Sequence, residues 1–305
     1  MPRLKVAFVG SGGGARGLSH LGVLKACEEL GVVPSIFVGA SAGALVAATY
    51  GQDIPLDVLL DGYRLPWRRR HRGPRLYMNT FLGLPKLRDL ADPGYLTSGV
   101  FSIEKLERYL ERYLPINDFR ELGNQVFVTA VDVDSGERVV FGPGHREDVP
   151  ISRAVAASCC VPGLFRPLEI GGRYFLDGEV VRTLSADVAV AAGANVVIIS
   201  NVYRPEHTQP DERSIARRGP LAVLRQSLSV VLSEKERRGV ELLSRNYPKV
   251  VFLDIAPDIG SFGYASRYAS RSLVLRGYRT ALRALTEAKE RGVFDQLLSP
   301  DAHLN

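Results

Sequence analysis

Residues 35–50 of the chain read Ser-Ile-Phe-Val-Gly-Ala-Ser-Ala-Gly-Ala-Leu-Val-Ala-Ala-Thr-Tyr, and they decide how the chain folds. A short apolar run, Ile36–Val38, is followed by the pentapeptide Gly39-Ala40-Ser41-Ala42-Gly43 and then by small residues that favour a helix. This order predicts a strand, a sharp turn and a helix. The pentapeptide has the G-x-S-x-G spacing of a nucleophile elbow, in which a serine hydroxyl is exposed at the tip of a strained turn.

The spacing of the two glycines has a steric reason. Gly39 and Gly43 carry no Cβ atoms, so the strand and the helix can approach each other closely on either side of Ser41. The N-terminus of the helix directs its positive end toward the serine, where negative charge develops during acyl transfer. Small residues in this order can also have the purely structural role of closing a tight turn. The predicted strand and helix around them favour a nucleophile.

A second glycine-rich turn precedes this one in the chain. Leu4–Gly10 predicts a buried first strand, and residues 11–17 (Ser-Gly-Gly-Gly-Ala-Arg-Gly) lead into a helix that begins near Leu18 and stops at Gly31. A glycine loop at a helix N-terminus directs several N–H groups toward one place and can bind an anion. A Walker phosphate loop is excluded because its lysine is missing.

Two uses of this glycine loop remain. Residues 10–15 satisfy the dinucleotide fingerprint G-x-G-x-x-[GA], but that motif requires an acidic residue near the end of the second strand, where this chain has Ser41. The other use is an oxyanion hole, in which the amides of Gly12, Gly13 and Gly14 bind a tetrahedral intermediate. We favour the oxyanion hole because the next strand brings a candidate nucleophile to the same edge of the sheet.

Together, the two turns resemble the opening of the patatin-like phospholipases. The segments that carry the resemblance are Gly12-Gly13-Gly14-Ala15-Arg16-Gly17 and Gly39-Ala40-Ser41-Ala42-Gly43. The resemblance implies a serine hydrolase that cleaves carboxylic esters of lipids. It implies that the glycine stretch forms the oxyanion hole, that Ser41 becomes acylated, and that Arg16 helps to hold the loop.

A later segment extends the resemblance toward the second half of the chain. Its residues fall in register with the family pattern A-S-x-x-x-P-x-x-F-x-P, and they are Ala157, Ser158, Pro162, Phe165 and Pro167. In the family this pattern leads to D-G-G, whose aspartate completes a Ser-Asp dyad. The resemblance therefore implies that Asp177 is the general base and acid, with Gly178 as a supporting residue.

The chain departs from the family pattern directly after this aspartate. Glu179 replaces the second glycine of D-G-G, and residues 182–185 (Arg-Thr-Leu-Ser) stand where an asparagine and a proline are more usual. A carboxylate two residues from Asp177 can raise the pKa of that group by repulsion, or it can point into solvent. Glu179 also keeps an alternative open, which is an anion- or ligand-binding module of the same fold that has lost hydrolysis.

The choice of base can be examined from the residues. Aspartate has an ordinary pKa of about 3.9, and burial raises it toward values useful to a base. The other candidates are the five histidines, which are His20, His71, His145, His207 and His303. None follows an acidic residue at a strand end, as the Ser, Asp, His order of the α/β-hydrolases requires. A triad through His145 or His207 remains the less favoured alternative.

A basic segment follows the first two turns. Between residues 64 and 75 there are six arginines, one tryptophan and no acidic residue. We expect this segment to contact an anionic membrane surface, with the indole at headgroup level and the guanidinium groups on phosphates. The residues concerned are Trp67, Arg68, Arg69, Arg70 and Arg72. A solvated loop is the alternative, and nucleic acid is not expected because no reading module accompanies the segment.

The overall composition restricts the class of protein. The chain has 305 residues, 46% of them hydrophobic, a net charge of +6 and a pI of about 9.3. No stretch reaches the length of a membrane span, and the N-terminus runs directly into a strand and is not typical of a signal peptide. Three cysteines form neither a disulfide framework nor a zinc spacing. We expect a cytoplasmic protein, able to bind peripherally at the inner membrane surface.

No cofactor or metal is predicted. Asp132 and Asp134 are separated by one residue, but Asp134-Ser135-Gly136 is a hairpin signal between two strand-like runs, so we interpret both acids as turn residues. The sequence leaves the oligomeric state open.

The predicted fold is α/β, with three layers and a mainly parallel sheet between helices. We expect one catalytic domain over residues 1–305, with a core that carries the motifs over about 5–200, a polar connector over 204–220 and a helical part over 221–305. Further helices are predicted over 103–114, 151–159, 185–192, 221–246 and 265–291. Further strands are predicted over 125–133, 137–141, 168–170, 174–176, 195–201 and 250–255.

Overall fold

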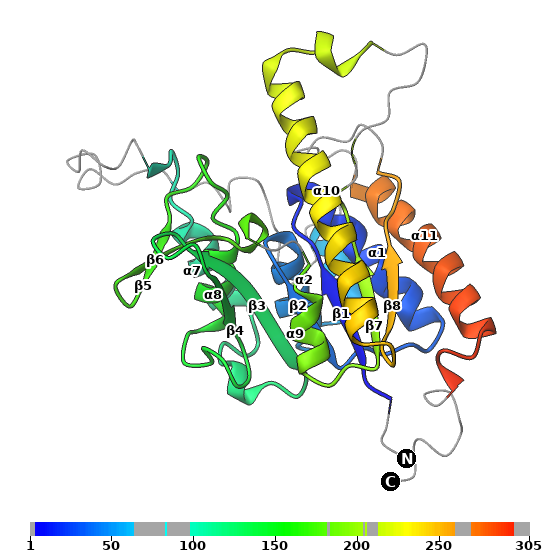
Figure 1. Cartoon of the computed structure of the whole chain (residues 1–305). Helices are drawn as coiled ribbons and strands as arrows, with labels where there is room; N and C mark the ends of the chain where they lie inside the picture. Colours follow the sequence, from blue (N-terminus) through cyan, green and yellow to red (C-terminus); the bar gives the residue numbers. More distant parts are fainter. Residues whose placement is uncertain are drawn as a thin grey trace.

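A single twisted sheet lies at the centre of the fold (Figure 1). The computed structural model describes residues 4–63, 83, 98–181, 184–203, 205, 213–259 and 270–295. Within these ranges eight strands form one sheet in the order β5-β6-β3-β2-β1-β7-β8, and β4 also pairs with β3. The pairs among β3, β2, β1, β7 and β8 are parallel, whereas β4, β5 and β6 enter antiparallel pairs.

The described elements have the following bounds. The strands are β1 Val6–Gly10, β2 Ile36–Gly39, β3 Gln125–Asp132, β4 Arg138–Phe141, β5 Leu168–Ile170, β6 Arg173–Asp177, β7 Val196–Ser200 and β8 Val251–Ile255. The α-helices are α1 Leu18–Glu29, α2 Ala42–Tyr50, α3 Leu56–Tyr63, α7 Glu104–Tyr113, α8 Ile151–Ser158, α9 Ala186–Ala191, α10 Pro220–Asn246 and α11 Ser270–Glu290. Short 3₁₀ helices are η1 Gly14–Gly17, η2 Phe119–Glu121, η3 Gly178–Val180 and η4 Ile215–Arg217.

The alternation of side chains along β1 explains the three layers. Val6 and Phe8 point to one face of the sheet, where they join the core under α1, α2 and α11. Ala7 and Val9 point to the other face and pack with α9 and with Leu243 of α10. Because both faces are covered, β1 is buried along its whole length, as is expected of a parallel strand between two helical layers. The predicted three-layer α/β fold is confirmed.

Helices α1 and α11 pack closely on one side of the sheet. A Cβ atom on Gly22 of α1 would lie 2.0 Å from the carbonyl oxygen of Val274. A Cβ atom on Gly277 of α11 would lie 2.1 Å from the carbonyl oxygen of Ser19. Neither helix could approach the other to this distance with a larger residue at these positions. This contact attaches the C-terminal helix to the first helix of the chain.

The parallel strands place their carboxyl ends at one edge of the sheet. Gly10 at the end of β1 lies opposite Gly39 of β2 and Ser200 of β7. Strand β3 continues past the end of β2, since Gly39 is level with Val128 and β3 ends at Asp132. Strand β6 pairs antiparallel with this extension, so the chain after β6 returns toward the end of β2. The register therefore directs Asp177 and η3 toward the turn after β2.

Two sequence predictions concern residues outside the described ranges. The segment proposed for membrane contact, Trp67 with Arg68, Arg69, Arg70 and Arg72, lies outside them, as do residues 204 and 206–212 of the polar connector predicted over 204–220. Helix α3, by contrast, lies in a region for which no helix was predicted. Within the part of the chain that the structure describes, no helix combines the length and the apolar character needed to cross a membrane.

Candidate active site

Ser41 occupies the turn between β2 and α2 in a conformation that is rare for serine. Its φ is 52° and its ψ is −119°, and it caps the N-terminus of α2. The turn is sharp because glycines flank it: a Cβ atom on Gly43 would lie 2.1 Å from the carbonyl oxygen of Gly10, and one on Gly39 would lie 2.2 Å from the carbonyl carbon of Gly43. The surrounding structure therefore holds Ser41 in a strained backbone conformation.

Ser158 at the end of α8 supports this turn. The amide of Ser41 donates a hydrogen bond to the Ser158 hydroxyl oxygen (2.8 Å), which in turn donates to the carbonyl oxygen of Thr129 on β3 (2.7 Å). The thiol of Cys159 lies 3.5 Å from the carbonyl oxygen of Ser41. The family pattern contains Ser158, but the sequence did not indicate what it contacts.

Asp177 lies at the end of β6 beside Ser41. The amide of Glu179 donates a hydrogen bond to Oδ1 of Asp177 (3.0 Å), and the Ser41 hydroxyl lies close enough to act as a second donor to this carboxyl group. Asp177 is 5% exposed. Burial raises the pKa of the Asp177 carboxyl to about 6, and the two hydrogen bonds oppose this shift. The structure thus brings together a serine hydroxyl and a carboxyl group that is ionised at neutral pH.

The glycine loop after β1 lies next to the same serine. A Cβ atom on Gly12 would lie 3.0 Å from Cβ of Ser41. Gly13, with a φ of 134°, caps η1, and its carbonyl oxygen accepts the bond from the Arg16 amide at 3.2 Å. The amides of Gly13 and Gly14 precede that bond and cannot donate within the short helix. Arg16, which the resemblance associates with this loop, is 2% exposed and therefore buried in the fold.

The carboxyl group of Glu179 also lies in this site. The Gly12 amide donates to Glu179 Oε1 at 2.6 Å, and Oε2 is buried with no hydrogen-bond partner among the described residues. Burial and the nearby charge of Asp177 raise the pKa of Glu179 well above its ordinary value, against the opposing effects of the Gly12 amide and of Lys235. The Glu179 carboxyl group thus accepts a hydrogen bond from one of the three amides that the sequence assigned to an oxyanion hole.

Gly178 gives this carboxyl group its position. A Cβ atom on Gly178 would lie 2.3 Å from the carbonyl oxygen of Thr129, so η3 can lie directly against β3 only with glycine there. Lys235 of α10 donates to the carbonyl oxygen of Val180 (3.2 Å) at the other end of η3. Glu179 is consequently held between the sheet and α10, and it is 5% exposed.

The described histidines have other roles. His20 Nδ1 lies 2.6 Å from the Ser200 hydroxyl and Nε2 lies 2.8 Å from the carbonyl oxygen of Ser11. Burial lowers the pKa of His20 to about 4, so the neutral ring accepts from Ser200 and donates to Ser11. These contacts join α1 to β7 and to the glycine loop. The ring of His145 packs edge-on against Phe127, while His71, His207 and His303 lie outside the described residues.

The acids of the β3–β4 hairpin are turn residues, as predicted. Asp132 accepts from the amides of Asp134 (3.0 Å) and Ser135 (3.1 Å), and it forms an ion pair with Arg173. Among the described residues, no group of three or more His, Cys, Asp or Glu side chains is placed to hold a metal ion.

The three cysteines are buried and unpaired. Cys27 lies on α1, and Cys159 and Cys160 follow α8. Burial raises the pKa of the Cys27 thiol to about 12 and that of the other two thiols above its ordinary range. All three therefore remain protonated thiols inside the folded chain.

Comparison with known sequences decides the family. A family model described as Patatin-like phospholipase matches residues 8–190, which is more than half of the 305 residues. The chain belongs to the patatin-like phospholipase family. The match begins in β1, includes Ser41 and Asp177 and ends in α9. The sequence-based recognition of this family is confirmed.

The relatives are larger proteins. Patatin-like phospholipase domain-containing protein 6 of Mus musculus is 29% identical over 205 residues, which is 67% of this patatin-like chain and 14% of the mouse protein. An uncharacterized NTE family protein of Mycobacterium tuberculosis is 25% identical over 300 residues, covering 93% of this chain and 47% of the relative. The patatin-like chain thus spans less than half the length of either curated relative.

Solved structures share the fold. VipD from Legionella pneumophila matches with a TM-score of 0.50 at 14% sequence identity, over 94% of this chain and 67% of VipD. At this level of identity the similarity concerns the arrangement of strands and helices.

Proposed function

We propose that this patatin-like chain is a lipid acyl hydrolase that works through Ser41 and Asp177. The observation that carries the proposal is the position of the Ser41 hydroxyl, on its strained turn, beside the buried carboxyl group of Asp177, whose pKa it lowers. A base is most effective when its pKa lies near the working pH, and a carboxyl group with a pKa of about 6 is largely ionised at neutral pH.

The proposed reaction has two steps. In the first, Ser41 Oγ attacks the ester carbonyl while Asp177 takes its proton, and Asp177 then gives that proton to the departing alcohol. In the second, Asp177 takes a proton from water, which attacks the acyl-enzyme and releases the fatty acid as Ser41 regains its proton. The amides of Gly13 and Gly14 can donate to the negatively charged oxygen formed in each step.

Glu179 adds a requirement to this mechanism. While its carboxyl group accepts from the Gly12 amide, that amide is not free for the substrate oxygen. The raised pKa of Glu179 keeps the group protonated over a wider pH range than an ordinary glutamate. A neutral carboxyl group costs less to displace than a carboxylate, because it does not compete as a charged acceptor for the amide. The Gly12 amide joins the other two donors only when Glu179 turns away.

The substrate class follows from the family and its relatives. The family description and the mouse relative both carry the word phospholipase in their names, which favours esters of fatty acids with a glycerol-type alcohol. A phospholipase A, a lysophospholipase and a carboxylesterase share the chemistry described above. All three predict a fatty acid as one product.

The test uses a fluorophosphonate probe and a p-nitrophenyl acyl ester. We expect one probe per chain on Ser41 and ester hydrolysis, with both lost in Ser41→Ala and the hydrolysis rate reduced roughly 10²–10⁴-fold in Asp177→Asn. Ser244→Ala is the matched control, because that hydroxyl donates only within α10 (to Val240, 2.9 Å) and is exposed. Full turnover by Ser41→Ala would exclude the proposed nucleophile.

A second candidate function is favoured by one observation. The Glu179 carboxyl group occupies the Gly12 amide and Ser41 is only 7% exposed, which suits a binding module of the same fold that no longer hydrolyses esters. Labelling discriminates the two functions, because the probe reacts only with an activated serine. Absence of labelling in the folded wild type and also in Glu179→Gly would favour the binding module.

A further inference from the structure

Helix α10 is longer than the strands on which it packs. It contains 27 residues, about 40 Å of α-helix, whereas β7, which precedes it, contains 5 residues, about 17 Å of strand. The C-terminal half is anchored, since Leu243 lies in the core against the sheet. The chain enters α10 from the carboxyl end of β7, so the excess length extends past the edge of the sheet at which the parallel strands end (Figure 1).

Lys235 marks the level of the active site along this helix, since it donates to Val180 beside Glu179. Pro220 lies 15 positions before Lys235, so the helix extends about 22 Å farther at 1.5 Å per residue. The overhanging part carries five exposed apolar side chains with exposed fractions of 41% to 60%, which are Val223, Leu224, Leu228, Val230 and Val231.

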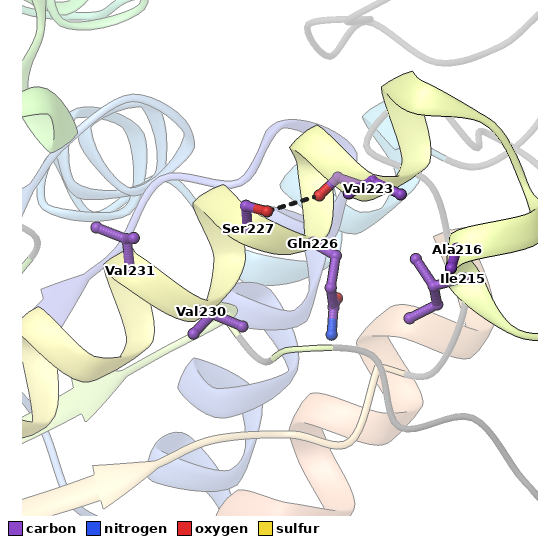
Figure 2. A pocket seen from close by; sticks show the side chains of 7 residues that line it. All are labelled: Ile215, Ala216, Val223, Gln226, Ser227, Val230 and Val231. Atoms are coloured by element: carbon purple, nitrogen blue, oxygen red, sulfur yellow. Dashed lines mark hydrogen bonds between the residues drawn. The ribbon is translucent and has the colours of Figure 1, made fainter.

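The helix η4 lies against this overhang. Figure 2 shows Ile215 and Ala216 on one side of an open groove and Val223, Gln226 and Val230 of α10 on the other, and the volume of the groove is about 400 Å³. Soluble proteins rarely expose contiguous apolar surface of this kind unless it binds something. The overhang and η4 together, residues 213–231, are called the apical surface below.

The charges of the apical surface have one sign. Residues 213–231 contain four arginines and no acidic residue. The following half of α10 is different, because its charges pair along the helix: Glu234 binds Arg237 and Arg238, and Glu241 binds Arg245. The exposed face of the N-terminal half of α10 is therefore apolar and cationic, whereas the charges on the exposed face of its C-terminal half are paired with one another.

We propose that the apical surface docks on an anionic lipid bilayer. An exposed apolar helix face next to arginines is the combination that binds the interface of anionic membranes, with the apolar side chains in the acyl boundary and the guanidinium groups on phosphates. The inference rests on the proposed function in one respect, since docking at this edge of the sheet brings Ser41 toward the lipid esters. A second copy of the chain is a poorer occupant, because two such surfaces would oppose the exposed Arg213, Arg217 and Arg218 of each copy.

The experiment measures flotation of the whole chain with vesicles of phosphatidylcholine alone and of phosphatidylcholine with phosphatidylglycerol. We expect binding to the anionic vesicles, and at least a tenfold loss in the variant with Leu224→Ser and Leu228→Ser. A variant with Arg217→Gln and Arg218→Gln should lose binding at low salt. Leu242→Ser is the matched control, because Leu242 is 55% exposed on the same helix but lies in its lower half.

Hydrolysis of a soluble ester in the same variants separates this inference from the proposed function. Unchanged hydrolysis with lost flotation supports docking by the apical surface. Equal flotation by the wild type and the leucine variant overturns it, as does a wild type that does not float. A concentration-dependent dimer that the leucine variant abolishes also overturns it, in favour of a second copy. If flotation behaves as expected but the wild type hydrolyses no ester, the docking stands and the proposed function fails.

Discussion

Two carboxyl groups lie two residues apart at the end of β6, and their surroundings assign them different states. Asp177 accepts from Ser41 and from the backbone, so it keeps much of its acidity despite burial. Glu179 has the Gly12 amide on one oxygen and, within the described part of the chain, no partner on the other, and it lies beside the charge of Asp177. The pKa values of the pair are therefore pushed apart, which is how neighbouring acids in active sites come to differ in protonation.

A pH profile of the probe reaction follows from these states. Ser41 reacts when Asp177 is ionised. Because the pKa of Asp177 is raised to about 6, the labelling rate should increase with pH, and the midpoint of this increase should lie near pH 6. At higher pH Glu179 loses its proton, and its charge opposes the negative oxygen on the attacked centre, so the rate should fall again. In Glu179→Gln the fall at high pH should disappear while the midpoint near 6 remains.

The charged groups around Glu179 are Asp177 on its own side and Lys235 from α10. Lys235→Met provides the control for this profile, since removal of the cation should move the high-pH fall further upward and leave the midpoint near 6 in place. The rate of fluorophosphonate labelling measures both limbs in one assay. A high-pH fall that persists in Glu179→Gln would assign it to another group.

At the scale of elements, two glycines decide how α1 and α11 meet. Gly277→Ala would place a methyl group 2.1 Å from the carbonyl oxygen of Ser19, so the helices must separate. We expect the free energy of unfolding to decrease by roughly 3 kcal/mol. Gly239→Ala on α10 is the control, because a Cβ atom there meets nothing within 4 Å, and better helix propensity should increase stability by roughly 0.5–1 kcal/mol.

Urea unfolding of both variants, compared with the wild type, gives these differences from the transition midpoints at constant slope. A Gly277→Ala chain as stable as the wild type would mean that the two helices can shift apart at little cost.

Most elements could be predicted from the sequence because their signals are local. Apolar runs between glycine and proline residues located the strands, and the α10 boundary at Pro220–Asn246 lies within one residue of the predicted start. Helix α3 escaped prediction because Leu56–Tyr63 is short and precedes a segment with no regular pattern. Ser41 and Asp177 could be proposed from short motifs, since each lies in a pattern only a few residues long.

The contacts between distant segments could not be predicted in the same way. The bond from Gly12 to Glu179 spans 167 residues, and the bond from Ser41 to Ser158 spans 117 residues. The first depends on the register of β6 against β3 and the second on the position of α8 against β3, which periodicity does not specify. The sequence indicated that Glu179 is unusual, but only the fold shows that it faces the glycine loop.

At the scale of the whole molecule, stability is distributed unevenly along the chain. Strands β1 and β7 are buried over their full lengths, whereas the N-terminal half of α10 projects from the sheet edge (Figure 1). Local opening costs least where few buried apolar contacts must break. Hydrogen exchange should therefore be fastest over residues 224–231, slower over 236–246 of the same helix and slowest in the two strands.

Mass spectrometry of peptides from the exchanging chain measures these rates. Anionic vesicles should slow exchange over 224–231 and leave 236–246 unchanged. Uniform protection along α10 in the absence of lipid would mean that the projecting half is held by contacts as strong as those of the anchored half.

The burial of the three thiols has a practical consequence for following the protein in motion. An alkylating reagent cannot reach Cys27 or Cys159 while the chain is closed, because both are shielded and both keep their protons. Cys27 becomes accessible when α1 leaves the sheet, and Cys159 when the backbone of Ser41 moves. Iodoacetamide uptake at each position would therefore time two separate openings in the unaltered chain, with no dye or spin label attached.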